Sequence, residues 1–206
     1  MTTHFQAISF TLAYFAMIWL TLGLYGCSHM QGDLPRVQAQ GHFTESEMRE
    51  AVDSVFGPGT YLYHTTGQNV RTYTTYRAED YEAVWRYVNA RTEPWSWGWL
   101  CVQFAQEIRM YMYRAAVRSG YTEAPAAIGW FIVEQKHPWG GVPAGGRHAL
   151  NVYVAGPRGT MQVWVMEPQT GIKALVGEQE EEGWAIHKHR YPNLPYVERR
   201  GVFLEL

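Results

Sequence analysis

The chain has 206 residues, a length that suits one domain of ordinary size with short appendages. Hydrophobic residues make up 47% of it and charged residues 17%, so it can bury an ample core and is not an intrinsically disordered chain. The formal net charge of -2 provides no basic surface, and we expect no nucleic-acid partner. The 9 Trp and 14 Tyr indicate either large core side chains or a surface that stacks on sugars or peptides.

The N-terminal region has the features of a membrane-targeting segment. Residues 7–26 form an uncharged apolar run of about twenty residues, long enough to cross a bilayer. The run leads into LYGC at 24–27, which resembles the lipobox of bacterial lipoproteins, although Tyr25 is bulky for that motif and no Lys or Arg precedes the run. We therefore expect residues 1–27 to be a lipoprotein signal peptide with Cys27 as the lipidation site, or else an uncleaved membrane anchor. Both alternatives place the following domain in the cell envelope, outside the cytoplasm.

A polar segment with Gly and Pro, residues 28–43, predicts a linker, and residues 44–206 then form the folded domain. Thr44 and Glu47 fit a capping box, in which the first side chain caps a helix start and the second reaches back to it. A short helix is therefore predicted to run to about Phe56, where Gly57-Pro58-Gly59 ends it.

Two further helices are predicted in the first half of this domain. Thr- and Tyr-rich stretches within residues 60–76 first indicate two extended segments. Residues 79–91 then have a helical apolar stripe that includes Trp85. After the irregular TEPWSWGW, residues 99–119 repeat apolar side chains at three- and four-residue steps, which predicts a largely buried helix that Gly120 ends.

In the second half the pattern changes to that of strands. Residues 128–134, 148–155 and 160–167 are the main candidates, and the Gly-Pro-Arg-Gly turn between the last two predicts a hairpin. The stretch EQEEEG at 178–183 predicts a solvated acidic loop, and the tail adds one or two strands. A helix-rich half followed by a strand-rich half predicts the α+β class.

Cysteine usage points to a reactive thiol. If Cys27 is lipidated, Cys101 has no disulfide partner, which is unusual in an exported domain because envelope compartments oxidise thiols. Cys101 falls in the first turn of the predicted helix, where unpaired N–H groups and the helix dipole favour a thiolate and help to hold an oxyanion. We therefore predict Cys101 to be a nucleophile, although a cysteine in an apolar helix is also an ordinary core residue.

His148 and Glu167 are the predicted partners of this thiol. In a hairpin the start of one strand lies opposite the end of the next, so His148 at the first and Glu167 at the second are expected to meet. His148 would then be the general base, and Glu167 would fix its tautomer. Taken singly, a histidine at a strand start or a glutamate before a proline also has an ordinary structural explanation.

Three short motifs resemble those of papain-like cysteine peptidases. They are Cys-x-x-Phe-Ala beginning at Cys101, Gly-Gly-x-His-Ala-x-Asn at 145–151 and Glu-Pro-Gln at 167–169. The likeness is nearest to the protease domain at the C-terminus of a mushroom agglutinin and to its bacterial and phage relatives. It implies a papain-like fold, in which the helix carrying the nucleophile packs on an antiparallel sheet. It also implies that Cys101, His148 and Glu167 form the catalytic triad.

The sequence departs from this family at the oxyanion hole. Papain-like enzymes place a glutamine several residues before the cysteine, where this chain has Pro94 and Trp95. Either backbone N–H groups, an indole N–H or a more distant amide such as that of Asn89 replaces that glutamine, or catalysis is impaired. The agglutinin relatives use calcium, but its ligands cannot be matched in this sequence. Calcium therefore rests on the resemblance alone, and from the residues we expect no cofactor and no metal site.

We interpret the chain as a membrane-tethered thiol hydrolase that cleaves a peptide or isopeptide amide in a protein or cell-wall substrate. Trp95, Trp97 and Trp99 flank the thiol and either line a substrate-binding cleft or belong to the core. If an amine replaced water, the same site would be a transglutaminase-like acyl transferase. The alternative from another class is a non-catalytic envelope lipoprotein that binds glycan or a protein partner through its aromatic surface.

Overall fold

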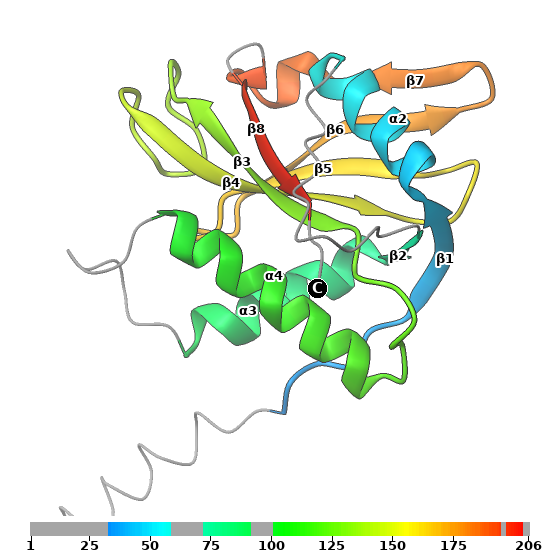
Figure 1. Cartoon of the computed structure of the whole chain (residues 1–206). Helices are drawn as coiled ribbons and strands as arrows, with labels where there is room; N and C mark the ends of the chain where they lie inside the picture. The colour runs from blue at the N-terminus through cyan, green and yellow to red at the C-terminus, as the bar shows by residue number, and fades with distance from the viewer. Residues whose placement is uncertain (1–32, 59–71, 92–100, 195–196, 204–206) are drawn as a thin grey trace, which may run out of the picture. The chain divides into compact units, whose positions relative to one another are not determined.

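The structure is a computed structural model that describes residues 33–58, 72–91, 101–194 and 197–203, and its elements lie in the unit Leu34–Leu206. The described residues form eight β-strands, three α-helices and one short 3-10 helix, and the strands hold more residues than the helices (Figure 1). The elements in chain order are β1 (Ala39–Thr44), α2 (Glu45–Phe56), β2 (Thr72–Tyr76), α3 (Ala78–Asn89), α4 (Cys101–Arg118), β3 (Ile128–Glu134), β4 (Arg147–Ala155), β5 (Gln162–Met166), β6 (Lys173–Glu180), β7 (Gly183–Ile186), η1 (Lys188–Arg190) and β8 (Val197–Phe203).

One mixed sheet contains all the described strands. Its main path is β1-β2-β4-β5-β6-β7, and β3 pairs with β4 and with β8. β2 runs parallel to β4, with Tyr76 opposite Ala155, and the other pairings are antiparallel. The predicted papain-like α+β fold, with a helix on an antiparallel sheet, is therefore wrong, because the described chain is a mostly β protein built on a mixed sheet. The prediction failed because β1 and β2, which lie among the helices in sequence, belong to the sheet.

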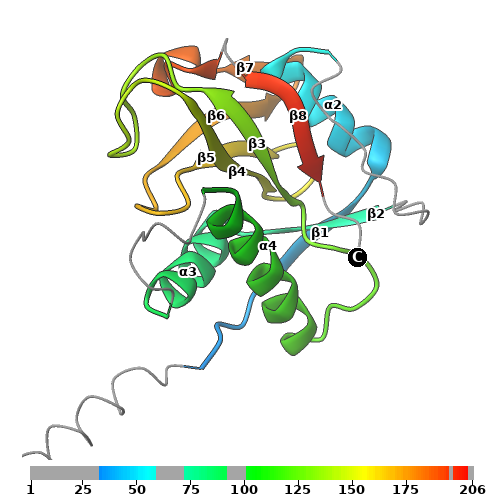
Figure 2. The same cartoon turned by 60° about the vertical axis from the view of Figure 1, so that its left-hand side comes forward.

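Helices cover both faces of this sheet, with α2 on one face and α3 and α4 on the other (Figures 1 and 2). β4 lies between these two layers of helices, and its side chains are buried on both faces of the sheet. Leu150 and Val152 belong to the apolar core beneath α2, whereas Tyr153 and Ala155 belong to the core beneath α3 and α4. A strand buried on both faces has a nearly continuous apolar sequence, as this one does.

Most of the predicted elements are confirmed. Thr44 caps α2, and Thr44 and Glu47 form both halves of the capping box. β3 has the predicted bounds, and β4 and β5 form the predicted hairpin. α4 is the predicted long helix, and Gly120 beyond its end has a φ of +91°, a conformation that glycine adopts without strain.

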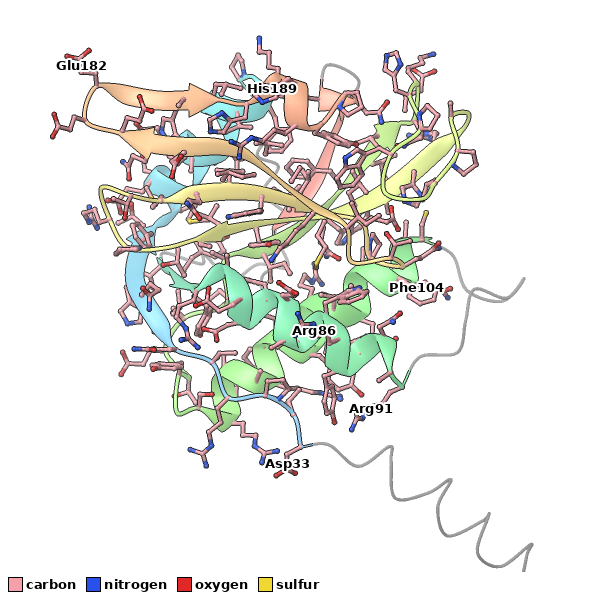
Figure 3. All side chains as sticks on the ribbon, turned by 180° about the vertical axis from the view of Figure 1, so that it is seen from behind. Asp33, Arg86, Arg91, Phe104, Glu182 and His189 are labelled. Atoms are coloured by element: carbon pink, nitrogen blue, oxygen red, sulfur yellow. The ribbon has the colours of Figure 1, made fainter. Side chains whose placement is uncertain are left out.

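Two segments differ from the sequence prediction. The last part of the predicted linker 28–43 forms β1, which pairs with β2. The predicted acidic loop 178–183 instead contributes to the β6–β7 hairpin, where Glu178 pairs with Ala185 and Glu182 lies at the turn (Figure 3). Charged side chains are common on strands near a sheet edge because they oppose pairing with other chains.

No helix among the described residues is long and apolar enough to cross a membrane. The apolar run 7–26 and Cys27 lie outside the described residues, so the predicted signal or anchor stays a prediction.

Candidate functional site

Cys101 is the first residue of α4, and its side chain is partly accessible to solvent. It is a free thiol. The backbone N–H of Ala149, in β4, donates to its Sγ at 3.4 Å, and the N–H of Val102 in its own helix also points to the sulfur. The sulfur thus lies where the start of α4 meets the start of β4, with two backbone donors directed at it.

His148 lies at the start of β4 and is buried, with 8% of its surface exposed. Its Nε2 is hydrogen-bonded to Oε2 of Glu167, and its ring lies close enough to the Cys101 thiol to lower the pKa of that thiol. Because Glu167 occupies Nε2, the ring nitrogen that remains for the thiol is Nδ1. The structure therefore brings together the three side chains that the sequence singled out.

Glu167 directly follows β5 and has no exposed surface. In addition to its bond with His148, it accepts the backbone N–H of Gln169 at Oε1, at 3.1 Å. Gly140 packs against its stem so closely that a Cβ there would lie 2.9 Å from the Glu167 Cβ. Both carboxylate oxygens are hydrogen-bonded, and the position of the side chain is constrained from two sides.

The three groups change one another's proton affinities. Burial raises the pKa of the Cys101 thiol. The interactions with His148, with the backbone N–H of Ala149 and with the positive charge of the imidazolium lower this pKa, and their combined effect is larger, so the net pKa lies below its usual value. Burial lowers the pKa of His148, but its hydrogen bonds to Cys101 and Glu167 and their negative charges raise it to about 9. The arrangement therefore shifts the thiol toward a thiolate and the imidazole toward an imidazolium, each relative to its ordinary state.

Asn151 ties the helix that carries the thiol to the sheet. Its Nδ2 donates to the carbonyl of Ala105 in α4 at 2.9 Å and to that of Gly129 in β3 at 3.2 Å. It lies three residues beyond His148 in β4 and is fully buried. These bonds fix the first turns of α4, and hence Cys101, relative to β4.

Several sequence predictions concern residues that the structure does not describe. Trp95, Trp97 and Trp99 lie outside the described residues, and so do Pro94 and Cys27. Asn89, the proposed oxyanion amide, is the last residue of α3. Within the described parts of the chain, no cluster of three or more His, Cys, Asp or Glu side chains is arranged to hold a metal ion. Calcium binding is suggested by the family resemblance alone.

Sequence reasoning missed two supports of the acidic residue. Gly140 belongs to none of the predicted motifs, and the sequence places Trp85 only in the apolar stripe of its helix. The indole N–H of Trp85 in fact donates to the carbonyl of Pro168, at 2.9 Å, immediately after Glu167. The Gly-Gly pair at 140–141 was the available sequence signal for a close backbone approach.

No family model matches the chain, and no curated protein matches it either. Among solved structures, it is similar to a lectin of Polyporus squamosus bound to a human-type influenza-binding epitope, with 16% identity and a TM-score of 0.49. A second similar structure is described as a PSL1a–E64 complex, with 16% identity and a TM-score of 0.48. Each match covers 65% of this chain and 45% of the other, so this chain spans less than half of those proteins. Scores this low do not identify a fold or a function.

Proposed function

We propose that the chain is a thiol-dependent acyl-transfer enzyme that cleaves amide bonds. The observation that supports this proposal is the chain of contacts from the Cys101 thiol through the His148 ring to the buried Glu167 carboxylate. A nucleophile, a base and a group that orients the base are the components of covalent amide hydrolysis, and they recur on unrelated folds. The proposal therefore rests on the geometry of the site and not on a fold relationship.

In the proposed reaction the Cys101 thiolate attacks the carbonyl carbon of an amide, and a C–S bond forms. Negative charge moves to the carbonyl oxygen, where N–H groups at the start of α4 can donate to it. The C–N bond then breaks, and the His148 imidazolium gives its proton to the leaving amine. Water next attacks the thioester while His148 accepts a proton from it. The carboxylic acid leaves, and the thiolate and imidazolium are regenerated.

The proposed substrate is a peptide or isopeptide amide of a protein or of the cell wall. This choice follows from the expectation that residues 1–27 direct the domain to the envelope through lipid on Cys27 or through an uncleaved helix. If the acceptor of the acyl group is an amine, the same steps give transamidation. Incubation of an acyl-donor peptide with and without a primary amine, followed by mass spectrometry, separates the two outcomes.

The reactivity of Cys101 tests the proposal without knowledge of the substrate. Iodoacetamide labelling is measured from pH 4.5 to 9, and peptide mapping by mass spectrometry assigns the label to Cys101. We expect labelling to persist at lower pH than that of an ordinary thiol, because the imidazolium stabilises the thiolate. His148→Ala should move labelling to the ordinary range, and Cys101→Ala should abolish it at this position. A wild-type thiol that reacts only at alkaline pH would rule out the enzyme.

Glycan binding without catalysis is the second candidate. The aromatic content favours it, because Trp95, Trp97 and Trp99 lie within five consecutive residues. One of the structures compared above is of a lectin bound to a glycan epitope, but that likeness is too low to transfer binding to this chain. A glycan array probed with the Cys101→Ala protein tests this candidate independently of the thiol. Specific binding that Trp97→Ala abolishes would support it.

A further inference from the structure

A side chain of α3 is hydrogen-bonded to the beginning of the turn that follows Glu167. The indole Nε1–H of Trp85, on α3, donates to the carbonyl of Pro168 at 2.9 Å, across 83 residues of sequence. Pro168 is the residue directly after Glu167, so this bond fixes the backbone next to the carboxylate. Glu167 also closes the turn itself, because its carbonyl accepts the N–H of Gly171 at 2.8 Å and its N–H donates to the carbonyl of Ile172 at 2.8 Å.

α3 also contacts the same turn further along. Gly171 lies directly against the Trp85 ring, where an added Cβ would be 2.4 Å from a ring carbon. Its φ of +70° is likewise one that glycine adopts without strain. Beyond it, Nζ of Lys173 forms an ion pair with Oε2 of Glu82 at 2.5 Å. The indole therefore supports the part of the turn nearest Glu167, and the ion pair supports its far end.

The same helix packs on the helix that carries the nucleophile. The rings of Tyr87 on α3 and Tyr111 on α4 lie 5.5 Å apart, centroid to centroid. The two helices run side by side on one face of the sheet, with Arg86 on α3 and Phe104 near the start of α4 (Figure 3). α3 is thus in contact both with the turn that holds the acid and with the helix that begins at Cys101.

We propose that Trp85 is a positioning residue of the candidate site, which holds Glu167 in hydrogen-bonding contact with His148 through the carbonyl of Pro168. The inference rests on the proposed function, which it extends to the residue that orients the acid. When the indole N–H is lost, the turn relaxes and the carboxylate shifts from the imidazole. His148 then becomes less basic, and the thiolate of Cys101 becomes less stable at neutral pH. Trp85 itself touches neither the thiol nor the imidazole in this arrangement.

Trp85→Phe tests the inference, because it keeps an aromatic ring against Gly171 and removes the donor. Two properties are measured in the full-length protein: the pH midpoint of iodoacetamide labelling at Cys101, and the titration of the His148 ring by NMR. We expect the labelling midpoint to rise by about one pH unit, which slows labelling about tenfold at pH 6. We expect the His148 pKa to fall by a similar amount.

Glu82→Gln is the matched control, since it is also on α3 and removes the contact at the far end of the turn. It should change labelling by less than twofold. If Trp85→Phe does not fold, as judged by circular dichroism, benzothienylalanine at position 85 keeps the shape of the indole and removes only the N–H. Unchanged labelling and unchanged His148 titration in a folded variant would overturn the inference.

The two readouts separate this inference from the proposed function. If the wild-type thiol is not activated, the proposed enzyme fails, yet the titration of His148 still reports on its contact with Glu167. A His148 pKa that falls in Trp85→Phe would then support the positioning role alone. A His148 pKa that is the same in both proteins would overturn that role, whatever the thiol does.

Discussion

His148 and Glu167 meet at the adjoining ends of β4 and β5, where Nε2 of the imidazole is hydrogen-bonded to Oε2 of a carboxylate that has no exposed surface. A buried carboxylate is stable only when it is hydrogen-bonded or paired with a positive charge. Glu167 meets this condition through His148 and the N–H of Gln169, and in return it favours the protonated imidazole. The charge state of His148 therefore depends on a residue that contacts neither solvent nor the thiol.

Glu167→Gln should deactivate the thiol while leaving the fold intact. The amide has nearly the same shape as the carboxylate but no charge, so the His148 pKa should fall by at least one unit from its value of about 9. Labelling of Cys101 should slow most near the lowered His148 pKa, where less imidazolium is present to stabilise the thiolate. The measurements are iodoacetamide kinetics and NMR titration of the His148 ring. A His148 pKa that does not move would show that Glu167 has no part in charging the ring.

The same pair should make stability depend on pH. The pKa of His148 is raised from 6.5 to about 9 on folding, so its contribution is fully present below pH 6.5 and is lost as pH rises through about 9. The shift corresponds to roughly 3 kcal/mol of unfolding free energy at most. Cys101 and Glu167 face the ring, and the lowered pKa of Cys101 acts in the opposite direction, because it adds stability as pH rises toward the range of an ordinary thiol.

Urea unfolding at pH 6 and pH 9.5 measures this effect. Wild type should lose more unfolding free energy over that interval than His148→Gln, which lacks the titrating group. Equal losses in the two proteins would contradict the predicted linkage.

Local patterns in the sequence were sufficient to predict the elements that hold the three central residues. A helix start at Cys101 and a hairpin that joins His148 to Glu167 both depend on periodicity and turn chemistry over a few residues. The structure brings these side chains together as that reasoning expected. Their catalytic roles stay predictions.

Long-range pairings could not be predicted in the same way. The parallel pairing of β2 with β4 rests on the register of Tyr76 with Ala155, which lie far apart in sequence, and its omission led to the wrong fold class. The apolar stripe on residues 79–91 includes Trp85, but such a pattern does not reveal that the indole donates to the carbonyl of Pro168. Glu178 and Glu180 resemble loop residues in the sequence because they belong to the end of β6, where the buried run of that strand has stopped.

Asn151→Leu should loosen the attachment of α4 to the sheet. The substitution removes both donated bonds and leaves the carbonyls of Ala105 and Gly129 without this buried partner. Loss of such bonds typically costs about 1–3 kcal/mol of unfolding free energy. Urea denaturation measures the loss, and Cys101 labelling should slow as the helix start moves. Gln106 is exposed on the same helix. The control variant Gln106→Ala should therefore change the unfolding free energy by less than about 0.5 kcal/mol. Equal stability of the two variants would contradict this role for Asn151.

Gly140→Ala should displace Glu167, whereas Gly159→Ala should not. Both glycines have positive φ, +66° and +85°, so an alanine at either position should cost about 1–2 kcal/mol in backbone strain. Only at Gly140 would the new Cβ meet Glu167, 2.9 Å from its Cβ, since nothing lies within 4 Å at Gly159. Urea denaturation should therefore show a larger loss of stability for Gly140→Ala than for Gly159→Ala, and NMR titration should show a lowered His148 pKa in Gly140→Ala alone. If the His148 pKa were the same in both variants, the close contact of Gly140 would not be what holds the carboxylate against the imidazole.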